Sequence, residues 1–456
     1  METGTVLQPF TRRRWPALEI ADAYLAFFQR RDHLLLPRSP LVVPGTTTHF
    51  VIAGMQPLMP YLRGETPSPA SRLTGVQTCL RTVDIERVGD NARTNTSFHM
   101  LGNWSVGDYG RREAIELALE LLDMFDLDRS RLWVTTFGGD EPRGLRPDDA
   151  AAEEWRRAGL PDERIVLLGY DDNFWTTGGP GPCGPDTELW VDRGPALGCG
   201  EPSCRPGCER CDRFLEIWNL VFIEFEQTPD GRYEPLPLKS VDTGMGLERF
   251  AAIAQGAPTV HGTDLFTPAR ARLAELAPRE SDGADSRLHE QRARHIVVDH
   301  ARAALLLGLA GVEPAHEGAG SVLRRLIRRA AAQGHALGLR RPFLAELAGP
   351  LVEAHGALLR PEELPRLPAV EALLTAEERG FARTLAAGLR LLDRVQPDER
   401  GVVPGERLFT LHAERGFPPD LAAELLVERG LAVDWPGYER ALAAHRAVSR
   451  VGKGQS

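Results

Sequence analysis

The order of strand and helix signals along the chain limits the possible folds more than any other feature. In the first half, short apolar runs alternate with Gly/Pro turns, and amphipathic helices are predicted at 15–36 and 111–128. In the second half Ala, Leu and Arg dominate and helical patterns recur. We therefore expect an α+β region at 1–256 and an all-α region at 257–456, with an exposed connection at 278–291.

The clearest strand signal is EIWNLVFIEFEQTPDGRYEPLPL, residues 216–238. An apolar run turns at TPDG and returns, which predicts a β-hairpin. Its first strand is almost continuously apolar, as expected for a central strand covered on both faces. Asn219 interrupts this run on the same strand face as Val221. Burying its amide unpaired would cost about 2–7 kcal/mol, so Asn219 needs a hydrogen-bond partner there.

A candidate ligand-binding segment is SVDTGMGLERFAAIAQG, residues 240–256. We expect a strand that ends near residue 241, a turn and then a helix. Two glycines allow the backbone to approach a ligand closely: Gly244 and Gly246. Arg249 falls in the first helical turn, where a cation opposes the helix dipole by about 0.3–1 kcal/mol. Either a bound anion or pairing with Glu248 or Asp242 would explain it.

The segment at 75–110 reads as strand, polar loop, strand. Arg81 ends the first strand and Phe98 lies in the second. A guanidinium facing an aromatic ring can hold a nucleotide by phosphate contact and base stacking. The alternative is an ordinary hairpin with a surface ion pair.

Six cysteines are present, and four of them lie within 199–211 in the spacing C-x4-C-x3-C-x2-C. Such a cluster can wrap one tetrahedral Zn²⁺, and four filled positions would make the site structural. The candidate ligands are Cys199, Cys204, Cys208 and Cys211. The alternative is four free or partly oxidised thiols. Cys79 and Cys183 stand apart and are expected to pack in the interior.

The segment EPAHEGAGSVLRRLIRRAAAQG, residues 313–334, carries a row of arginines on one helical stripe: Arg324, Arg325, Arg328 and Arg329. Such a stripe can follow a phosphate backbone, or it can be a solvated face paired with local acids. The chain has a net charge of −10, so any nucleic-acid contact must be local. All basic residues but Lys239 and Lys453 are arginine, which we attribute to composition rather than to phosphate binding.

No apolar run approaches the roughly 20 residues that span a bilayer, so no membrane partner is expected. The N-terminus lacks the apolar stretch of a secretory signal. A cytoplasmic protein is therefore predicted.

Six motifs together resemble the catalytic half of the alanyl-tRNA synthetases, which are class II aminoacyl-tRNA synthetases. In chain order they are AGMQP, LGNWSVGDY, DNFWTTGGPGPCGP, EIWNLVF, SVDTGMGLERF and VLRRLIRRA. The resemblance implies a class II antiparallel sheet flanked by helices, followed by a helical tRNA-recognition domain. It implies that ATP, with Mg²⁺, and L-alanine form alanyl-adenylate, from which alanine passes to an acceptor.

The resemblance also implies residue roles. The matching catalytic residues are Arg81, Asp242 and Arg249. The matching ATP-binding residues are Arg81, Phe98, Met100, Gly246 and Arg249. Arg81 would bridge the α-phosphate and the amino-acid carboxylate. The matching alanine-binding residues are Trp175, Asn219, Val221, Asp242 and Gly244. Asp242 would hold the α-ammonium and Asn219 would face the carboxylate.

The chain departs from the family pattern at four positions. Ser97 and His99 replace the usual Phe and Glu around Phe98. His316 and Ala319 replace an Asn and an Arg before the arginine-rich helix, and in the family that Asn helps to read the G:U pair of the acceptor stem. We predict His316 and the arginine stripe as the acceptor-binding surface.

Two kinds of acceptor for the alanyl group are therefore possible. The first is tRNA(Ala), as in a minimal alanine–tRNA ligase. The second is a non-tRNA acceptor in specialised metabolism, such as a carrier protein or a small nucleoside or amine metabolite. The family's editing and C-terminal domains are expected to be missing, because nothing here matches the editing domain's His/Cys metal motif and the sequence stops at VGKGQS, about half the usual family length. A non-enzymatic paralogue that only binds alanine or ATP is a third possibility, which the matching catalytic residues argue against.

Overall fold

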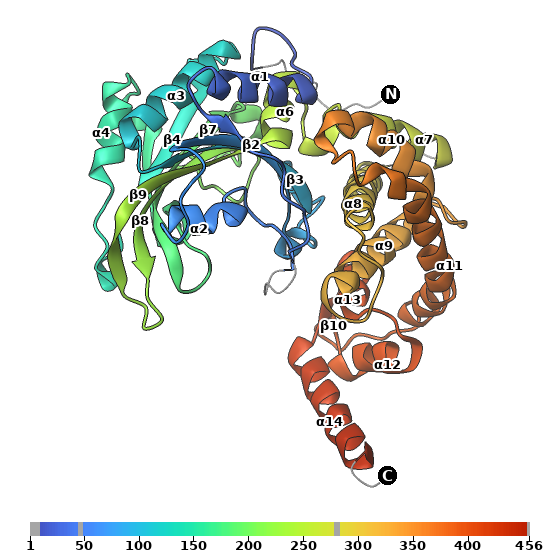
Figure 1. Cartoon of the computed structure of the whole chain (residues 1–456). Helices are drawn as coiled ribbons and strands as arrows, with labels where there is room; N and C mark the ends of the chain where they lie inside the picture. Colours follow the sequence, from blue (N-terminus) through green and yellow to red (C-terminus); the bar gives the residue numbers. More distant parts are fainter. Residues whose placement is uncertain (1–9, 44–48, 278–282, 454–456) are drawn as a thin grey trace.

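The computed structural model describes residues 10–43, 49–277 and 283–453. Figure 1 shows a sheet with covering helices beside a stack of further helices. The predicted change of pattern is confirmed, because the nine-stranded sheet is complete by residue 246 and most of the later described residues are helical. The expected connection at 278–291 is wrong in part, since a helix begins at Ala284; residues 278–282 lie outside the described residues.

The sheet is mixed, with an antiparallel centre and parallel pairs at its two edges. Its order is β1-β2-β3-β9-β8-β7-β4-β5, with β6 paired to β7. The pairs β1–β2 and β4–β5 are parallel. The bounds of the strands are β1 (Leu34–Leu35), β2 (Arg72–Leu80), β3 (Ser97–Val106), β4 (Leu132–Phe137), β5 (Ile165–Leu168), β6 (Phe174–Trp175), β7 (Gly181–Asp192), β8 (Phe214–Gln227) and β9 (Tyr233–Gly246). The expected α+β arrangement is confirmed.

The predicted hairpin forms the middle of this sheet. Strands β8 and β9 pair antiparallel, and β8 lies between β9 and β7, as its apolar sequence predicted. The expected strand end near residue 241 is wrong, because β9 continues through Asp242 to Gly246. The glycines remain extended there because β3 and β8 both pair with them, for example Met100 with Gly246 and Asn219 with Gly244.

Alternation gives the sheet one apolar face and one face with polar side chains. The apolar face packs beneath helices α1 (Ala17–Gln29), α3 (Arg111–Met124) and α6 (Leu247–Gln255) in one large core. A register shift between β7 and β8 leaves an extra residue near Ile217. Because of this bulge, Glu216 and Asn219 lie on the same face although they are three residues apart.

Four further helices complete the first half and its junction: α2 (Met59–Leu62), α4 (Asp149–Arg157), α5 (Tyr170–Asn173) and α7 (Thr267–Leu276). The following helices are α8 (Ala284–Leu309), α9 (Gly318–Ala336), α10 (Ala345–His355), α11 (Leu367–Leu392), α12 (Gly405–Arg415), α13 (Pro419–Val427) and α14 (Trp435–Lys453). Two short strands, β10 (Val402–Val403) and β11 (Ala432–Val433), pair with each other.

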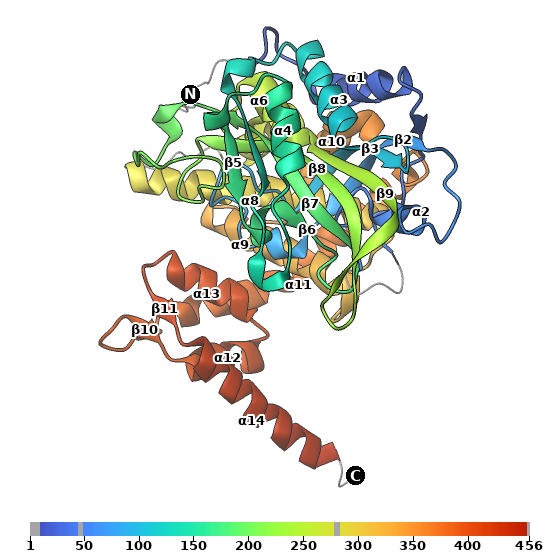
Figure 2. The same cartoon turned by 90° about the vertical axis from the view of Figure 1, so that its left-hand side faces the viewer.

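The main hydrophobic core does not stop at residue 256. It continues from the sheet and α6 through α8 and α9 to Leu374 in α11. A second core joins the end of α11 to α12 and α13. The predicted domain boundary therefore marks a change in secondary structure within one packed core. Helix α14 extends away from the body (Figure 2). In the part of the chain that is described, no helix is long and apolar enough to cross a membrane.

Candidate active site

A cavity of about 500 Å³ lies on the polar face of the sheet, over β3, β9, β8 and β7. All ten residues predicted for ATP and alanine line it: Arg81, Phe98, Met100, Trp175, Asn219, Val221, Asp242, Gly244, Gly246 and Arg249. They come from distant parts of the chain but share one face, because strand side chains alternate. The structure thus brings the predicted site residues together, while their individual roles stay predictions.

One wall of the cavity combines a guanidinium with an aromatic ring. Arg81 follows the last residue of β2, and its Nε donates a hydrogen bond of 3.0 Å to the carbonyl of Ile52. The guanidinium carbon lies 4.9 Å from the centroid of the Phe98 ring. Nη1 and Nη2 are not occupied by a carboxylate in the ion pairs of the described residues. This wall can therefore offer both a planar cation and an aromatic face to one ligand.

Arg249 lies in the first turn of α6, as predicted, but neither proposed acid pairs with it. Its Nη1 donates to Glu216 Oε2 at 2.6 Å, and its Nε donates to the carbonyl of Arg93 at 3.3 Å. Burial alone would lower the pKa of Arg249, but the Glu216 carboxylate outweighs it and raises that pKa. Arg249 is therefore a fixed cation at the cavity wall.

Glu248, one of the two acids proposed for Arg249, touches the cavity wall but belongs to a buried cluster behind β3. His99 donates to it through its backbone N–H, and Arg302 Nη1 lies 2.8 Å from Glu248 Oε1. Burial would raise the pKa of Glu248, but Arg302 and His99 outweigh burial and hold that pKa at about 2. The His99 ring contacts Glu248, and the backbone carbonyl of Ser97 accepts from Arg302, so the two departures from the family pattern lie behind the cavity wall.

Asp242 is a buried carboxylate at the base of the cavity. Trp104 Nε1 donates a hydrogen bond of 2.6 Å to its Oδ1. Burial raises the pKa of Asp242 to about 7, although the Trp104 hydrogen bond lowers it. A ligand cation in the cavity would favour the ionised form, so Asp242 is suited to binding an ammonium group.

The side chain of Asn219 has one half of its hydrogen-bonding capacity unused. The Asn219 side chain lowers the pKa of the nearby Asp186 carboxyl group, as an N–H donor such as Nδ2 does. Oδ1 is buried and has no hydrogen-bond partner among the described residues. Buried polar atoms rarely lack a hydrogen-bond partner, and an N–H donor from a ligand would provide one for this oxygen.

Apolar groups limit the space around Asn219. Val221 is buried beside Trp175 in a cluster that also includes Trp104 and Met100. Gly244 lies opposite Asn219 in the β8–β9 pair, and a Cβ there would lie 2.7 Å from the Sδ of Met100. This close approach, rather than an unusual φ, is what a glycine at this position allows.

Sequence reasoning missed the acidic residues that β7 and β8 place at the cavity. Glu188 and Glu216 line the cavity, and Asp186 lies below it. Burial raises the pKa of Asp186 to about 8 and that of Glu188 well above its usual value. Their signal was present in DTELW, where acids occupy alternate positions of an otherwise apolar strand.

The four clustered cysteines also meet in space. The Sγ–Sγ distances are 3.9 Å for Cys199–Cys208, 3.5 Å for Cys204–Cys211 and 3.8 Å for Cys208–Cys211. Four thiolates about 2.3 Å from a tetrahedral metal ion lie about 3.8 Å from each other. The four sulfur atoms therefore fit a single metal ion. Gly207 and Glu209 of this loop line the cavity, so the cysteine loop forms part of its wall.

The arginine stripe is less uniform than its sequence predicted. Arg324 donates to Nδ1 of His316, Arg325 pairs with Glu86, and Arg328 Nε lies 2.7 Å from Glu377 Oε1. The prediction of a surface arginine is wrong for Arg329, because only 4% of this residue is exposed. Its position on α9 faces the interior between α8 and α13, so it cannot belong to a surface that follows a phosphate backbone.

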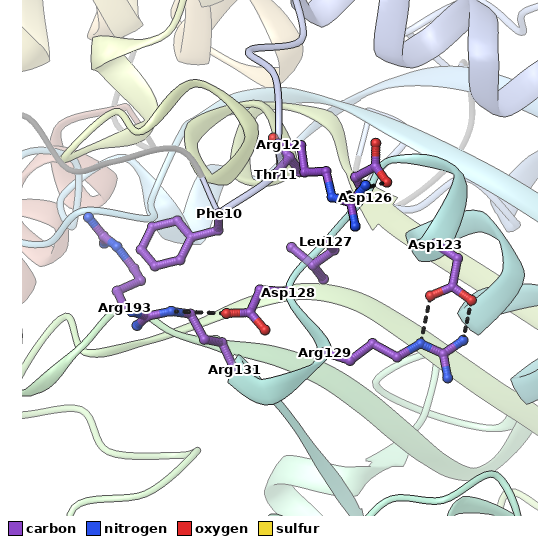
Figure 3. Close-up of a pocket in the computed structure, with 10 residues that line it drawn as sticks. All are labelled: Phe10, Thr11, Arg12, Asp123, Asp126, Leu127, Asp128, Arg129, Arg131 and Arg193. Carbon is purple, nitrogen blue, oxygen red and sulfur yellow. Dashed lines mark hydrogen bonds and ion pairs between the residues drawn. The ribbon is translucent and has the colours of Figure 1, made fainter.

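A separate hollow of about 910 Å³ lies beside the end of α3 (Figure 3). None of the predicted site residues lines it. Three of its four arginines are paired with its own acids, as in Arg12–Asp126 at 3.8 Å and Arg131–Asp128 at 3.7 Å. The fourth, Arg193, donates to the backbone carbonyls of Asp212 and Pro258.

Comparison with known proteins identifies the class. The family described as "tRNA synthetases class II (A)" matches residues 19–456. The chain belongs to this family. The apo histidyl-tRNA synthetase of S. aureus is similar with a TM-score of 0.33 and 10% identity, over 56% of this chain and 74% of that one.

Among curated relatives, the Alanine–tRNA ligase of Thermoanaerobacter sp. (strain X514) is 40% identical over 439 residues. That of Acidothermus cellulolyticus is 42% identical over 446 residues. These alignments cover 95% and 94% of this chain and 48% of each relative. The chain thus spans about half the length of the curated relatives that it matches.

Proposed function

We propose that this chain is an alanine-activating ligase of the alanine–tRNA ligase type. It joins L-alanine to the α-phosphate of ATP, releases pyrophosphate, and passes the alanyl group to tRNA(Ala). Family membership and the names of the curated relatives support this proposal. The observation that carries it is the single cavity in which Asp242 and the unpaired Asn219 oxygen lie near two arginines, Arg81 and Arg249.

The alanine end of the cavity is defined by Asp242, Asn219 and their apolar neighbours. The ionised Asp242 carboxylate receives the α-ammonium. Family resemblance assigned Asn219 to the substrate carboxylate, but its unpaired oxygen accepts rather than donates, so we assign it to the α-ammonium as well. Val221 and Trp175 restrict the side chain to a small group. Discrimination against glycine is weak, because one methyl group contributes only about 1–3 kcal/mol.

The phosphate end needs no general base. The alanine carboxylate is already a nucleophile, and one of its oxygens attacks the α-phosphorus while the bond to pyrophosphate breaks. Arg81 aligns the carboxylate with the α-phosphate, and Arg249 stabilises negative charge on the phosphates. Phe98, Met100 and Gly246 line the nucleotide side. Mg²⁺ accompanying ATP adds positive charge at the phosphates, and Glu188 and Glu216 offer the oxygen ligands that this ion prefers.

We also propose that Cys199, Cys204, Cys208 and Cys211 bind one structural Zn²⁺. The sulfur distances fit tetrahedral thiolate coordination, and no ligand position remains for substrate. The ion would hold the loop that carries Gly207 and Glu209 against the cavity.

The acceptor surface that we propose consists of His316 with the three outward arginines of α9: Arg324, Arg325 and Arg328. Arg325 and Arg328 form partly exposed ion pairs with Glu86 and Glu377, which a phosphate could displace, and Arg324 donates to His316. Arg329 is not included.

Two measurements separate activation from transfer. Alanine-dependent ATP–pyrophosphate exchange tests adenylate formation, and charging of tRNA(Ala) tests the acceptor. We expect both activities. Exchange without charging would reject tRNA(Ala) as the acceptor and leave the non-tRNA acceptors to be screened. The absence of exchange, with a folded protein that binds ATP, would reject the enzymatic proposal itself.

A further inference from the structure

The loop between β2 and β3 carries much of the nucleotide side of the cavity. It runs from residue 81 to residue 96, and six of its residues line the cavity: Arg81, Asp84, Arg87, Arg93, Thr94 and Asn95. A loop of this length has many conformations, so something must fix it if Arg81 is to stay aligned. The helices on its other side provide the contacts.

Asp299 of α8 holds the end of this loop. Its carboxylate accepts from the backbone N–H of Thr96 at 3.1 Å and from Nδ2 of Asn95 at 3.1 Å. The carbonyl of Thr96 in turn accepts the backbone N–H of Arg81 at 2.9 Å. One buried carboxylate is therefore two hydrogen bonds from the backbone of the predicted catalytic arginine. Asp299 itself is 0% exposed.

Arg329 of α9 holds the beginning of the same loop. Its Nη1 donates to the carbonyl of Ile85 at 2.5 Å, and its Nη2 donates to that of Glu86 at 3.4 Å. Its Nε and Nη2 also bind both oxygens of Glu424 in α13, each at 2.7 Å. A planar guanidinium can make all these contacts at once, whereas a lysine cannot.

His300 joins the two contacts into one cluster. It accepts from Arg329 Nη1 at its Nε2, 2.7 Å away. Because an arginine only donates, Nε2 must be unprotonated, so the proton of the neutral ring lies on Nδ1, 3.0 Å from Asp299 Oδ2. The cluster Asp299–His300–Arg329 thus contacts the loop near both of its ends from behind the cavity (Figure 1 shows α8 beside β3 and α9 beside α8).

Buried ion pairs such as Arg329–Glu424 are weak evidence for stability, because desolvation offsets their attraction. They can instead select one geometry. We propose that Asp299, His300 and Arg329 are positioning residues for adenylate formation, which act by fixing the loop that carries Arg81. This inference rests on the proposed function. It also gives a reason for an arginine at 329 that involves no tRNA.

The variant Arg329→Lys separates positioning from acceptor binding. Pyrophosphate exchange requires no tRNA, so an acceptor contact would leave it intact. We expect kcat for alanine-dependent exchange to fall at least tenfold, with a smaller change in the KM for ATP, because Arg81 acts mainly on the transition state. We also expect faster hydrogen exchange at the amides of residues 81–96, including Thr96.

The matched control is Arg429→Lys, which makes the same substitution in an exposed ion pair of 2.9 Å with Asp393, away from the loop. It should leave both readouts unchanged. If Arg329→Lys does not fold, Asp299→Asn provides the same test, since it is isosteric and keeps one oxygen acceptor. Wild-type kcat for exchange in a folded variant, or unchanged protection of the loop, would overturn the inference. Loss of exchange in the wild-type protein would instead count against the proposed function, while loop protection would still test the cluster.

Discussion

The cavity face of the sheet and the arginine-rich face of α9 were both predicted as binding surfaces, but they differ in how much of their polar capacity is free. In the cavity, the Asn219 oxygen has no partner among the described residues and Asp242 has only Trp104. On α9, each of the four arginines already contacts a described residue, and Arg329 is buried. We therefore base the proposed ligand site on the unused hydrogen-bonding capacity in the cavity, whereas charge alone was a weaker guide on α9.

The largest effect is expected from Arg249→Ala. It removes a cation that we place at the ATP phosphates and leaves Glu216 unpaired beside them. Pyrophosphate exchange should fall by about 1,000-fold or more, as for loss of a preorganised electrostatic contact. Arg112→Ala, which breaks the exposed pair with Glu116, is the control for loss of an arginine. Exchange at the wild-type rate in folded Arg249→Ala would contradict the assignment of the ATP side.

Asp242→Asn should separate activity from stability. We expect the KM for alanine to rise by about 100-fold, because the ammonium loses its counter-ion. The folded-state pKa of Asp242 is about 7 and its usual value is 3.8, so ionising Asp242 costs stability as pH rises from about 4 to 7. The variant should therefore melt at a higher temperature than wild type at pH 8 and at nearly the same temperature at pH 4. If the difference in melting temperature between variant and wild type stayed the same from pH 4 to pH 8, it would contradict the raised pKa of Asp242.

A moderate effect is expected from loss of the metal. Purified protein should contain about one zinc per chain, and Cys208→Ser should reduce this content. Because Gly207 and Glu209 line the cavity, we expect the KM for ATP to rise by about fivefold. Cys79→Ser is the control for a cysteine outside the cluster. A zinc content near zero in wild-type protein that has not met a chelator would reject the metal site.

The smallest effect is expected on α9. Arg328→Gln should raise the KM for tRNA by a few fold and reduce the salt dependence of charging, as for one phosphate contact. Arg360→Gln, which breaks a partly exposed ion pair with Glu363 outside α9, is the matched control. A large loss of exchange in Arg328→Gln would mean that this residue, like Arg329, supports the cavity instead of the acceptor.

Much of the sheet could be predicted because its signals are local. TPDG specified the β8–β9 turn, and the apolar run before it specified a central strand. Alternation also placed Asn219 and Val221 on one face. It could not place Glu216 there, because the bulge near Ile217 depends on the pairing with β7. The end of β9 was missed for a similar reason, since its glycines are extended only because β3 and β8 pair with both edges.

The sequence by itself determined the composition of the site. Its motifs specified ten cavity residues and four clustered thiols, and each side chain's chemistry follows from its identity. Only the tertiary structure decided the partners: Glu216 for Arg249, the cluster behind the cavity for Ser97 and His99, and the loop between β2 and β3 for Arg329. The physical reason is that the helical stripe fixes which residues share a face, while burial of that face depends on helices far away in the chain.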